Sequence, residues 1–208
     1  MGLNRRIAGR HGHGGAGAAD GFSPRAAVRG LARQPLKRGG KNYFEAPETY
    51  FLGKWEDKHP LNVPGPFYGA ATDTCGDGPP LAPASLLCDT EGMGFVWRQP
   101  RDEAETLALM TGASSDPFMG YACDGDEHWT ADQVRIWWHQ REGHQPAIDK
   151  LVSEVARPGF PAATDYELTI VRQYLDYRQS TMEGDLRRYI FFLEVGAYLG
   201  TEDELPQL

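Results

Sequence analysis

The chain has 208 residues, 40% of them hydrophobic, and a net charge of −8, so it can fold into one domain with a core of its own. No run approaches the roughly 20 apolar residues of a membrane span, so we expect no membrane segment. Three cysteines are too few for a disulfide framework and favour a reducing compartment. Arg5-Arg6 lacks the apolar stretch that follows in an export signal, and we expect a cytoplasmic protein.

Charge divides the chain near residue 40. Residues 1–40 carry eight basic side chains and one acid, a net charge of +7, which leaves −15 for residues 41–208. The glycine-rich start predicts a flexible basic arm, although Ser23-Pro24 could also open one short basic helix. We expect residues 41–208 to form a single acidic domain. Because phosphate binding requires Lys and Arg, nucleic acid is conceivable only through the arm.

The first half of the acidic domain predicts little regular structure apart from one hairpin. Aromatic residues lie among prolines in residues 43–70, which is typical of an ordered but irregular segment, and residues 72–84 predict a loop. Residues 85–89 and 94–98 are apolar runs on either side of a glycine-containing turn. They predict an antiparallel β-hairpin.

The second half predicts helices, from capping boxes, strong helix formers and apolar faces. A small sheet followed by a helical C-terminal half favours an α+β fold. The expected helices cover residues 102–111 with Gly112 just past the end, residues 131–141 and 164–179 after capping boxes at Thr130 and Thr164, and residues 185–198.

Residues 116–129 hold the densest group of reactive side chains. Asp124, Asp126 and Glu127 lie between Cys123 and His128, just before the N-terminus of a predicted helix. Backbone N–H groups and the helix dipole at such a place lower the pKa of nearby acids and thiols. The segment is therefore a candidate for a metal ion or an activated nucleophile.

Zinc is the metal that best suits these ligand types. A zinc site could be formed by Cys75, Cys123 and His128, together with Cys88. However, no two of these residues have the C-x₂₋₄-C spacing that places two zinc ligands in one turn. An iron–sulfur cluster usually requires four thiolates. Residues 73–78 and 124–126 each resemble the beginning of an EF-hand loop, but neither stretch is followed by the acid that an EF-hand needs at its twelfth position. We expect no cofactor, with zinc as the alternative.

A catalytic pair is a further hypothesis, with Cys123 as nucleophile and His128 or His59 as base. No third group or oxyanion hole is apparent in the sequence. The structural alternative is that Asp124 and Asp126 cap the turn while His128 packs under the helix. We favour this structural alternative.

Trp137 and Trp138 are neighbours on a predicted helix, and adjacent helical residues cannot both point inward. We expect one to lie in the core and the other to be partly exposed, where a tryptophan is a frequent anchor for a partner. The predicted partner-binding surface consists of Asp124, Asp126, Glu127, Trp137 and Trp138.

Four stretches, residues 62–69, 73–75, 95–100 and 124–129, resemble a group of uncharacterised proteins from high-GC bacteria. The resemblance covers about residues 43–208. Some members of that group carry the label ferredoxin, which the three cysteines do not support. The resemblance implies a bacterial cytoplasmic origin and assigns no functional residue.

The resulting hypothesis is a non-enzymatic binding or accessory protein, of a regulatory or immunity type, whose acidic body engages a basic protein. The alternative is an enzyme of undefined class, such as a metal-dependent hydrolase, that uses the loop from Cys123 to His128. The arm could separately tether the body to RNA or to a larger assembly.

Overall fold

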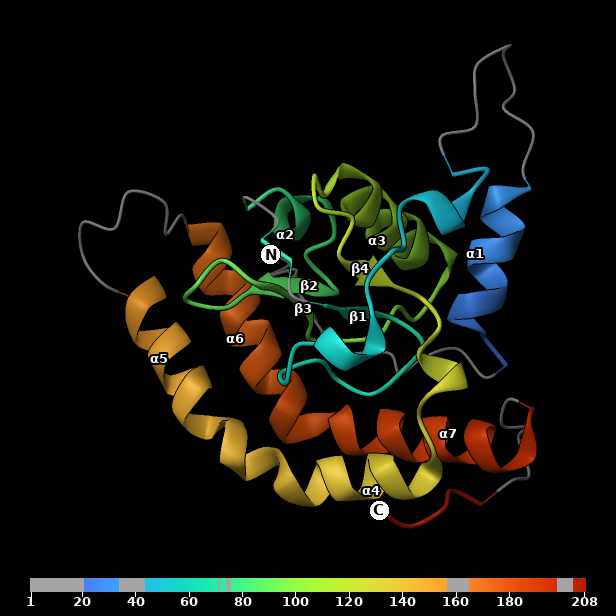
Figure 1. The fold of residues 1–208 in the computed structure, drawn as a ribbon. Coiled ribbons are helices and arrows are strands. Elements are labelled where there is room, and N and C mark those ends of the chain that lie inside the picture. The colour runs from blue at the N-terminus through green and yellow to red at the C-terminus, as the bar shows by residue number, and fades with distance from the viewer. Residues whose placement is uncertain (1–20, 34–43, 71, 74–75, 157–164, 198–203) are drawn as a thin grey trace, which may run out of the picture.

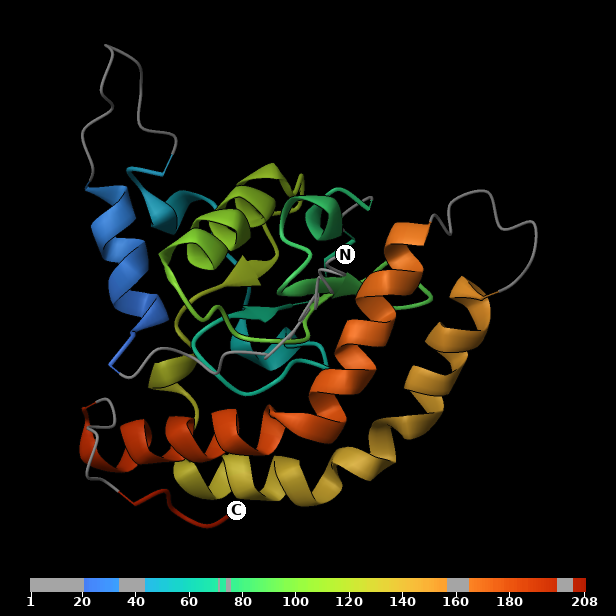
Figure 2. The same cartoon turned by 180° about the vertical axis from the view of Figure 1, so that it is seen from behind.

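The computed structural model describes residues 21–33, 44–70, 72–73, 76–156, 165–197 and 204–208. The fold is α+β, as predicted, with small antiparallel sheets and a mainly helical C-terminal half. Figures 1 and 2 show the helices α4 and α5 running beside α7 and α6, so that the four helices wrap one side of the strand-containing half. The helices and their bounds are α1 (Pro24–Ala32), α2 (Gly78–Leu81), α3 (Glu103–Ser115), α4 (Ala131–Gln140), α5 (Gln145–Val155), α6 (Asp165–Ser180) and α7 (Met182–Val195), with the 3-10 helices η1 (Pro47–Thr49), η2 (Trp55–Asp57), η3 (Gly125–Glu127) and η4 (Arg141–His144).

The predicted hairpin is confirmed. Strands β2 (Leu86–Cys88) and β3 (Gly94–Val96) pair antiparallel, and Gly92 turns the chain between them with a φ of +84°. This conformation costs little for glycine because it has no Cβ.

A second antiparallel pair was not predicted. Strands β1 (Tyr68–Gly69) and β4 (Tyr121–Ala122) have two residues each and lie far apart in the sequence, so local patterns carry no trace of them. The two sheets approach closely at Gly69, where a Cβ atom would lie 2.2 Å from the carbonyl oxygen of Gly94. Glycine is therefore required where β1 passes β3.

The prediction that Gly112 ends a helix is wrong, because α3 continues to Ser115. A Cβ atom at position 112 would lie 2.9 Å from Cδ1 of Leu86. The glycine allows α3 to pack closely against β2 and α2. It serves contact between elements rather than a helix end.

The later helices were predicted with shifted bounds, and one was missed. The capping box of Thr130 and Gln133 is present at the start of α4, whereas Thr164 lies outside the described residues. Helix α7 ends at Val195 rather than at residue 198, and Gly196 caps it with a φ of +74°. Helix α5 was not predicted, although its first turn contains a proline and it buries Ile148.

Residues 24–32 form helix α1, which is the short basic helix predicted as the alternative to a flexible arm. Ser23 caps the helix by accepting a hydrogen bond from the backbone N–H of Ala26. Val28 and Leu31 are buried in a cluster with residues of α3, and Arg25 pairs with Glu127. The charge boundary near residue 40 is therefore not a packing boundary.

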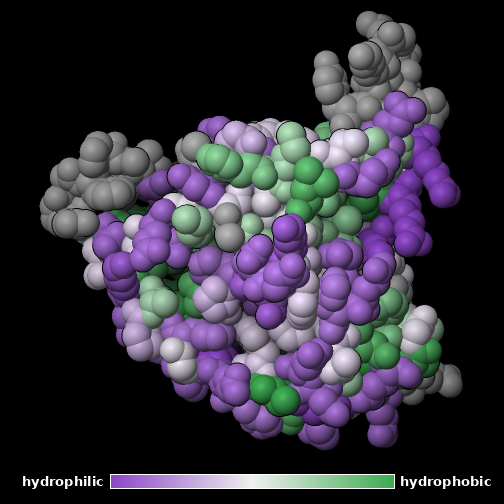
Figure 3. Space-filling view, viewed as in Figure 1, coloured by the Kyte–Doolittle hydropathy of each residue, from purple (hydrophilic) through white to green (hydrophobic). Residues whose placement is uncertain are grey.

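The core has two main parts. The larger one joins helices α4 to α7 to the hairpin, and in it the Trp97 ring contacts the rings of Tyr174 and Tyr177. The other surrounds α3 and includes Phe67 and Tyr121. None of the helices in the described part of the chain is both long and apolar enough to cross a membrane. The face shown in Figure 3 is mostly hydrophilic, with hydrophobic residues in separate patches.

Candidate functional site

The predicted acidic loop is built into the fold through its side chains. The hydroxyl group of Tyr68 donates to Oδ1 of Asp124 at 2.9 Å, and Nε2 of His128 lies 3.3 Å from Oδ2. Tyr189 donates to Oδ1 of Asp126 at 2.9 Å. Glu127 forms an ion pair with Arg25 of α1. Each predicted acid therefore has a partner in its own chain.

Two pKa shifts in this loop run opposite to the expected direction. Burial raises the pKa of the Cys123 thiol to about 11, which outweighs the opposing effect of Arg25. Burial also raises the pKa of Asp126, against the hydrogen bond from Tyr189 and the charge of Arg25. The expectation that the following helix lowers these pKa values is wrong here, because desolvation disfavours the charged forms.

The predicted Cys–His pair is not assembled. His128 is stacked on Trp55, with ring centroids 4.8 Å apart, and its ring nitrogen faces Asp124. Between the described residues Cys123 and His128 there is no hydrogen bond. A protonated thiol without a base is a poor nucleophile.

The effect of burial on Asp126 predicts that Asp126→Asn stabilises the fold at neutral pH. The folded-state pKa is raised, so the wild type loses stability as the pH rises from the unfolded pKa of about 3.9 through the folded pKa. The Asn variant does not titrate, and its oxygen can still accept from Tyr189. Urea unfolding should show a difference near zero at about pH 3 that grows to a plateau at neutral pH.

The exposed residue Glu91 offers the control, since Glu91→Gln removes one charge in a surface turn. We expect no comparable gain from it. An Asp126→Asn protein that is less stable than the wild type at neutral pH would show that the attraction of Arg25 dominates instead.

Of the predicted zinc ligands, Cys88, Cys123 and His128 lie among the described residues. Cys75 lies outside the described residues. Among the residues that are described, no three His, Cys, Asp or Glu side chains are grouped so that they could hold a metal ion. Cys123 and His128 therefore do not fit a zinc site by themselves, and the set with Cys75 stays a prediction.

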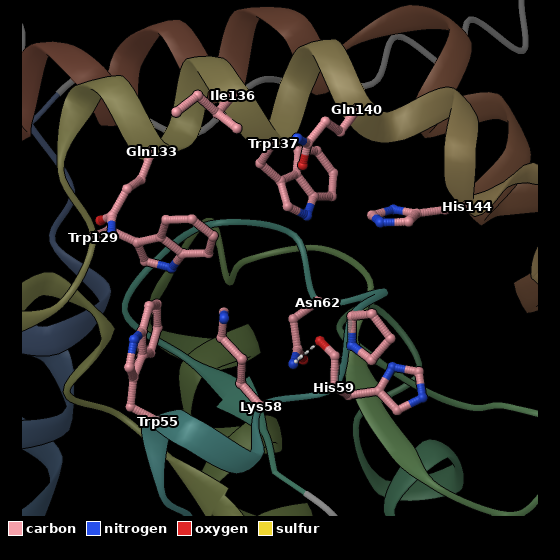
Figure 4. Close-up of a pocket in the computed structure, with 11 residues that line it drawn as sticks. Trp55, Lys58, His59, Asn62, Trp129, Gln133, Ile136, Trp137, Gln140 and His144 are labelled. Carbon is pink, nitrogen blue, oxygen red and sulfur yellow. Dashed lines mark hydrogen bonds between the residues drawn. The ribbon is translucent and has the colours of Figure 1, made fainter.

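A groove lies between residues 55–62 and the helices α4 and η4, and we name it the Trp137 groove (Figure 4). Its volume is about 330 Å³, within the range of small-molecule sites. Aromatic rings, amides and imidazoles line it, with one charged side chain. The lining residues are Trp55, Lys58, His59, Pro60, Asn62, Trp129, Gln133, Ile136, Trp137, Gln140 and His144.

At one end of the groove, the ammonium group of Lys58 lies against a cluster of aromatic rings. Trp55, in η2, contacts Trp129 edge to face at 5.1 Å between centroids. The ammonium group of Lys58 lies 4.5 Å from the ring centroid of Trp55 and 5.7 Å from that of Trp129. Such cation–π contacts hold the lysine beside the rings. In Figure 4 its side chain points from the 55–62 segment into the groove.

The floor of the groove is held by Asn62, which is 3% exposed. Its amide nitrogen donates to the carbonyl oxygens of His59 and Gly69, and its oxygen accepts from the backbone N–H groups of Gly69 and Val96. The side chain thereby joins residues 59–62 to β1 and β3.

The two hydrogen-bond partners of His59 show which of its ring nitrogens carries the proton. Its Nδ1 accepts from the backbone N–H of Leu61 at 3.1 Å, so Nε2 carries the proton and donates to Asp89, also at 3.1 Å. The ring stacks on Phe95. Both nitrogens are occupied, and His59 is therefore not placed to act as the predicted base.

The opposite wall comes from α4 and η4. The Trp137 ring is half-buried and lies 5.8 Å from the His144 ring. Burial lowers the pKa of His144, and the nearby charge of Arg178 lowers it further. The imidazole is therefore neutral at neutral pH, with one nitrogen able to donate and one able to accept.

Trp138 lies on another side of α4 from the groove. It lines a separate polar cavity, and the guanidinium group of Arg141 covers its ring at 3.6 Å. Both tryptophans are half-buried at the edge of the core, so the expectation that one is partly exposed is met and the expectation that the other is fully in the core is wrong. Of the predicted partner-binding residues, only Trp137 lines the groove. Trp55 and Lys58 were missed because only the fold brings them opposite α4.

Comparisons with known proteins leave the chain without an assigned family. No protein-family model, no curated protein and no solved structure matches it.

Proposed function

We propose that the chain is a non-enzymatic binding protein and that its ligand binds in the Trp137 groove. The supporting observation is the half-buried Trp137 ring, which faces a groove that also exposes Lys58 and His144. Aromatic surface with a few convergent polar groups is typical of small-molecule sites. An aromatic side chain also offers a large contact area at a low cost in conformational entropy.

The other hypotheses receive less support from the geometry. Each acid of the predicted basic-partner surface already has a partner within the chain, in Tyr68, Tyr189 or Arg25, so the loop is not a set of free carboxylates. An enzyme that uses Cys123 would need a thiolate, and burial raises the pKa of that thiol to about 11. We therefore place the binding surface in the groove rather than in the acidic loop.

Binding of a neutral aromatic probe tests this proposal. In the ¹⁵N-labelled protein we expect added indole to shift the indole N–H signals of Trp129 and Trp137, because the probe contacts their rings. Trp97 provides an internal control, since its Nε1 donates to the carbonyl oxygen of Pro83 within the core. The Trp97 signal should not move.

The variant Trp137→Ala should reduce the affinity for indole roughly tenfold, as expected for the loss of an aromatic anchor. The matched control is Trp138→Ala, which removes the same side chain from another side of α4. Equal losses in both variants, or shifts spread over all five indole signals, would contradict the groove as the binding site.

A further inference from the structure

The charge of the Trp137 groove differs from that of the protein. The chain carries a net charge of −8, yet the one ionised side chain among the residues that line the groove is Lys58. His144 is neutral at neutral pH, and His59 donates a hydrogen bond from Nε2 to Asp89 while its Nδ1 accepts from Leu61. No described carboxylate forms an ion pair with Lys58, whose ammonium group lies against Trp55 and Trp129.

We propose that the ligand of the groove is a small organic carboxylate with a planar ring, bound by its carboxylate to Lys58 and by its ring to Trp137. This inference rests on the proposed function. A lysine held beside aromatic rings and without an acidic partner is a site for an anion, and charge-assisted hydrogen bonds are about twice as strong as neutral ones.

The available ring faces assign the stacking partner. His128 is stacked on Trp55, and the ammonium group of Lys58 also lies over the Trp55 ring. Trp129 is 9% exposed and meets Trp55 edge to face. Trp137 is half-buried like Trp55, but its ring contact is the tilted one with His144 at 5.8 Å, and it stands across from Lys58 in Figure 4. The ring of the ligand therefore lies against Trp137.

The donors around Lys58 suit a carboxylate better than a phosphate. Phosphate sites typically use arginine forks or the N–H groups of a helix N-terminus. At the start of α4 the N–H of Gln133 is bound by the Thr130 side chain, and no arginine is among the lining residues. The side-chain oxygen of Gln133 accepts from Thr130, which leaves its amide N–H groups as donors to a ligand.

Indole-3-acetate and indole-3-acetamide test the inference, because they differ in the carboxylate and share the ring. Titrations followed by the Trp137 indole signal should show the carboxylate binding roughly five- to tenfold more tightly than the amide. In Lys58→Gln this preference should disappear while the amide still binds, and Lys58→Arg should restore it. The control Lys150→Gln removes the same charge from the exposed side of α5 and should leave the preference unchanged.

The outcomes separate the two proposals. Equal affinities of the wild type for both compounds would overturn the carboxylate assignment and leave the groove as a binding site. Tighter binding of phenyl phosphate than of phenylacetate would overturn it in favour of a phosphate. If neither indole compound nor indole itself binds, the proposed function fails as well.

Discussion

Replacing Asn62 by alanine is expected to lower the free energy of unfolding by roughly 3 kcal/mol, because four buried hydrogen bonds are lost at once. The backbone N–H groups of Gly69 and Val96 would be left without their acceptor in a place that water does not reach. For a chain of this size the loss corresponds to a melting temperature lower by roughly 10 °C. Urea and thermal unfolding followed by tryptophan fluorescence measure both values.

Two variants separate this role from a general effect of losing an amide. Gln140→Ala removes an exposed amide from the same groove and should change stability by less than about 0.5 kcal/mol. Asn62→Asp keeps the acceptor but places a carboxylate oxygen against the carbonyl oxygens of His59 and Gly69. It should be nearly as damaging as alanine. An Asn62→Ala protein within about 1 kcal/mol of the wild type would refute this account.

Replacing Asp116 by alanine is expected to cost roughly 3–5 kcal/mol, the largest effect that we predict for a single side chain. Asp116 is 2% exposed. Its carboxylate accepts from the hydroxyl group of Thr72 at 2.5 Å and from the backbone N–H groups of Phe118 at 3.0 Å and Gly120 at 2.8 Å. These bonds hold the turn that leads from α3 into β4.

The backbone around Asp116 explains why the turn depends on one side chain. Met119 has a φ of +52°, a conformation that non-glycine residues rarely adopt. A Cβ atom at Gly120 would lie 2.2 Å from Cβ of Thr72, so only glycine fits there. The carboxylate offsets this local strain by binding both neighbouring N–H groups.

Thr72→Val and Asp77→Ala complete the test of Asp116 by urea unfolding. Thr72→Val removes one of the three donors and should cost roughly 1–2 kcal/mol. Asp77 is exposed and its side chain caps no helix, so Asp77→Ala should be nearly neutral. A cost for Asp116→Ala no larger than that for Asp77→Ala would show that the buried carboxylate contributes nothing.

The hairpin and most of the later helices were predictable because they depend on local patterns. Two apolar runs on either side of a glycine-containing turn predict the hairpin β2–β3, and the capping box at Thr130 predicts the start of α4. Both signals act between residues a few positions apart, and tertiary contacts strengthen them without changing them. The same local reasoning missed α5, which follows directly on η4 without a capping side chain.

The candidate site was predicted far less well, since its residues come from separate parts of the chain. Loop 123–128 concentrates reactive side chains in the sequence, but burial and contacts with Tyr68, Tyr189 and Arg25 decide their state. A helix N-terminus nearby suggested lowered pKa values, whereas desolvation raises the pKa of Cys123. Desolvation depends on what the rest of the chain places around a group, which no local pattern contains.

The sequence by itself determined the α+β class, the hairpin, the start of α4 and the charge contrast along the chain. Only the tertiary structure decided that α1 packs on α3, that the acids of the loop are bound internally, and that Lys58 faces Trp137 across a groove. The physical reason is the distance along the chain over which each feature is determined. Turns, caps and periodicity are properties of adjacent residues, whereas a groove exists only where distant segments leave space between them.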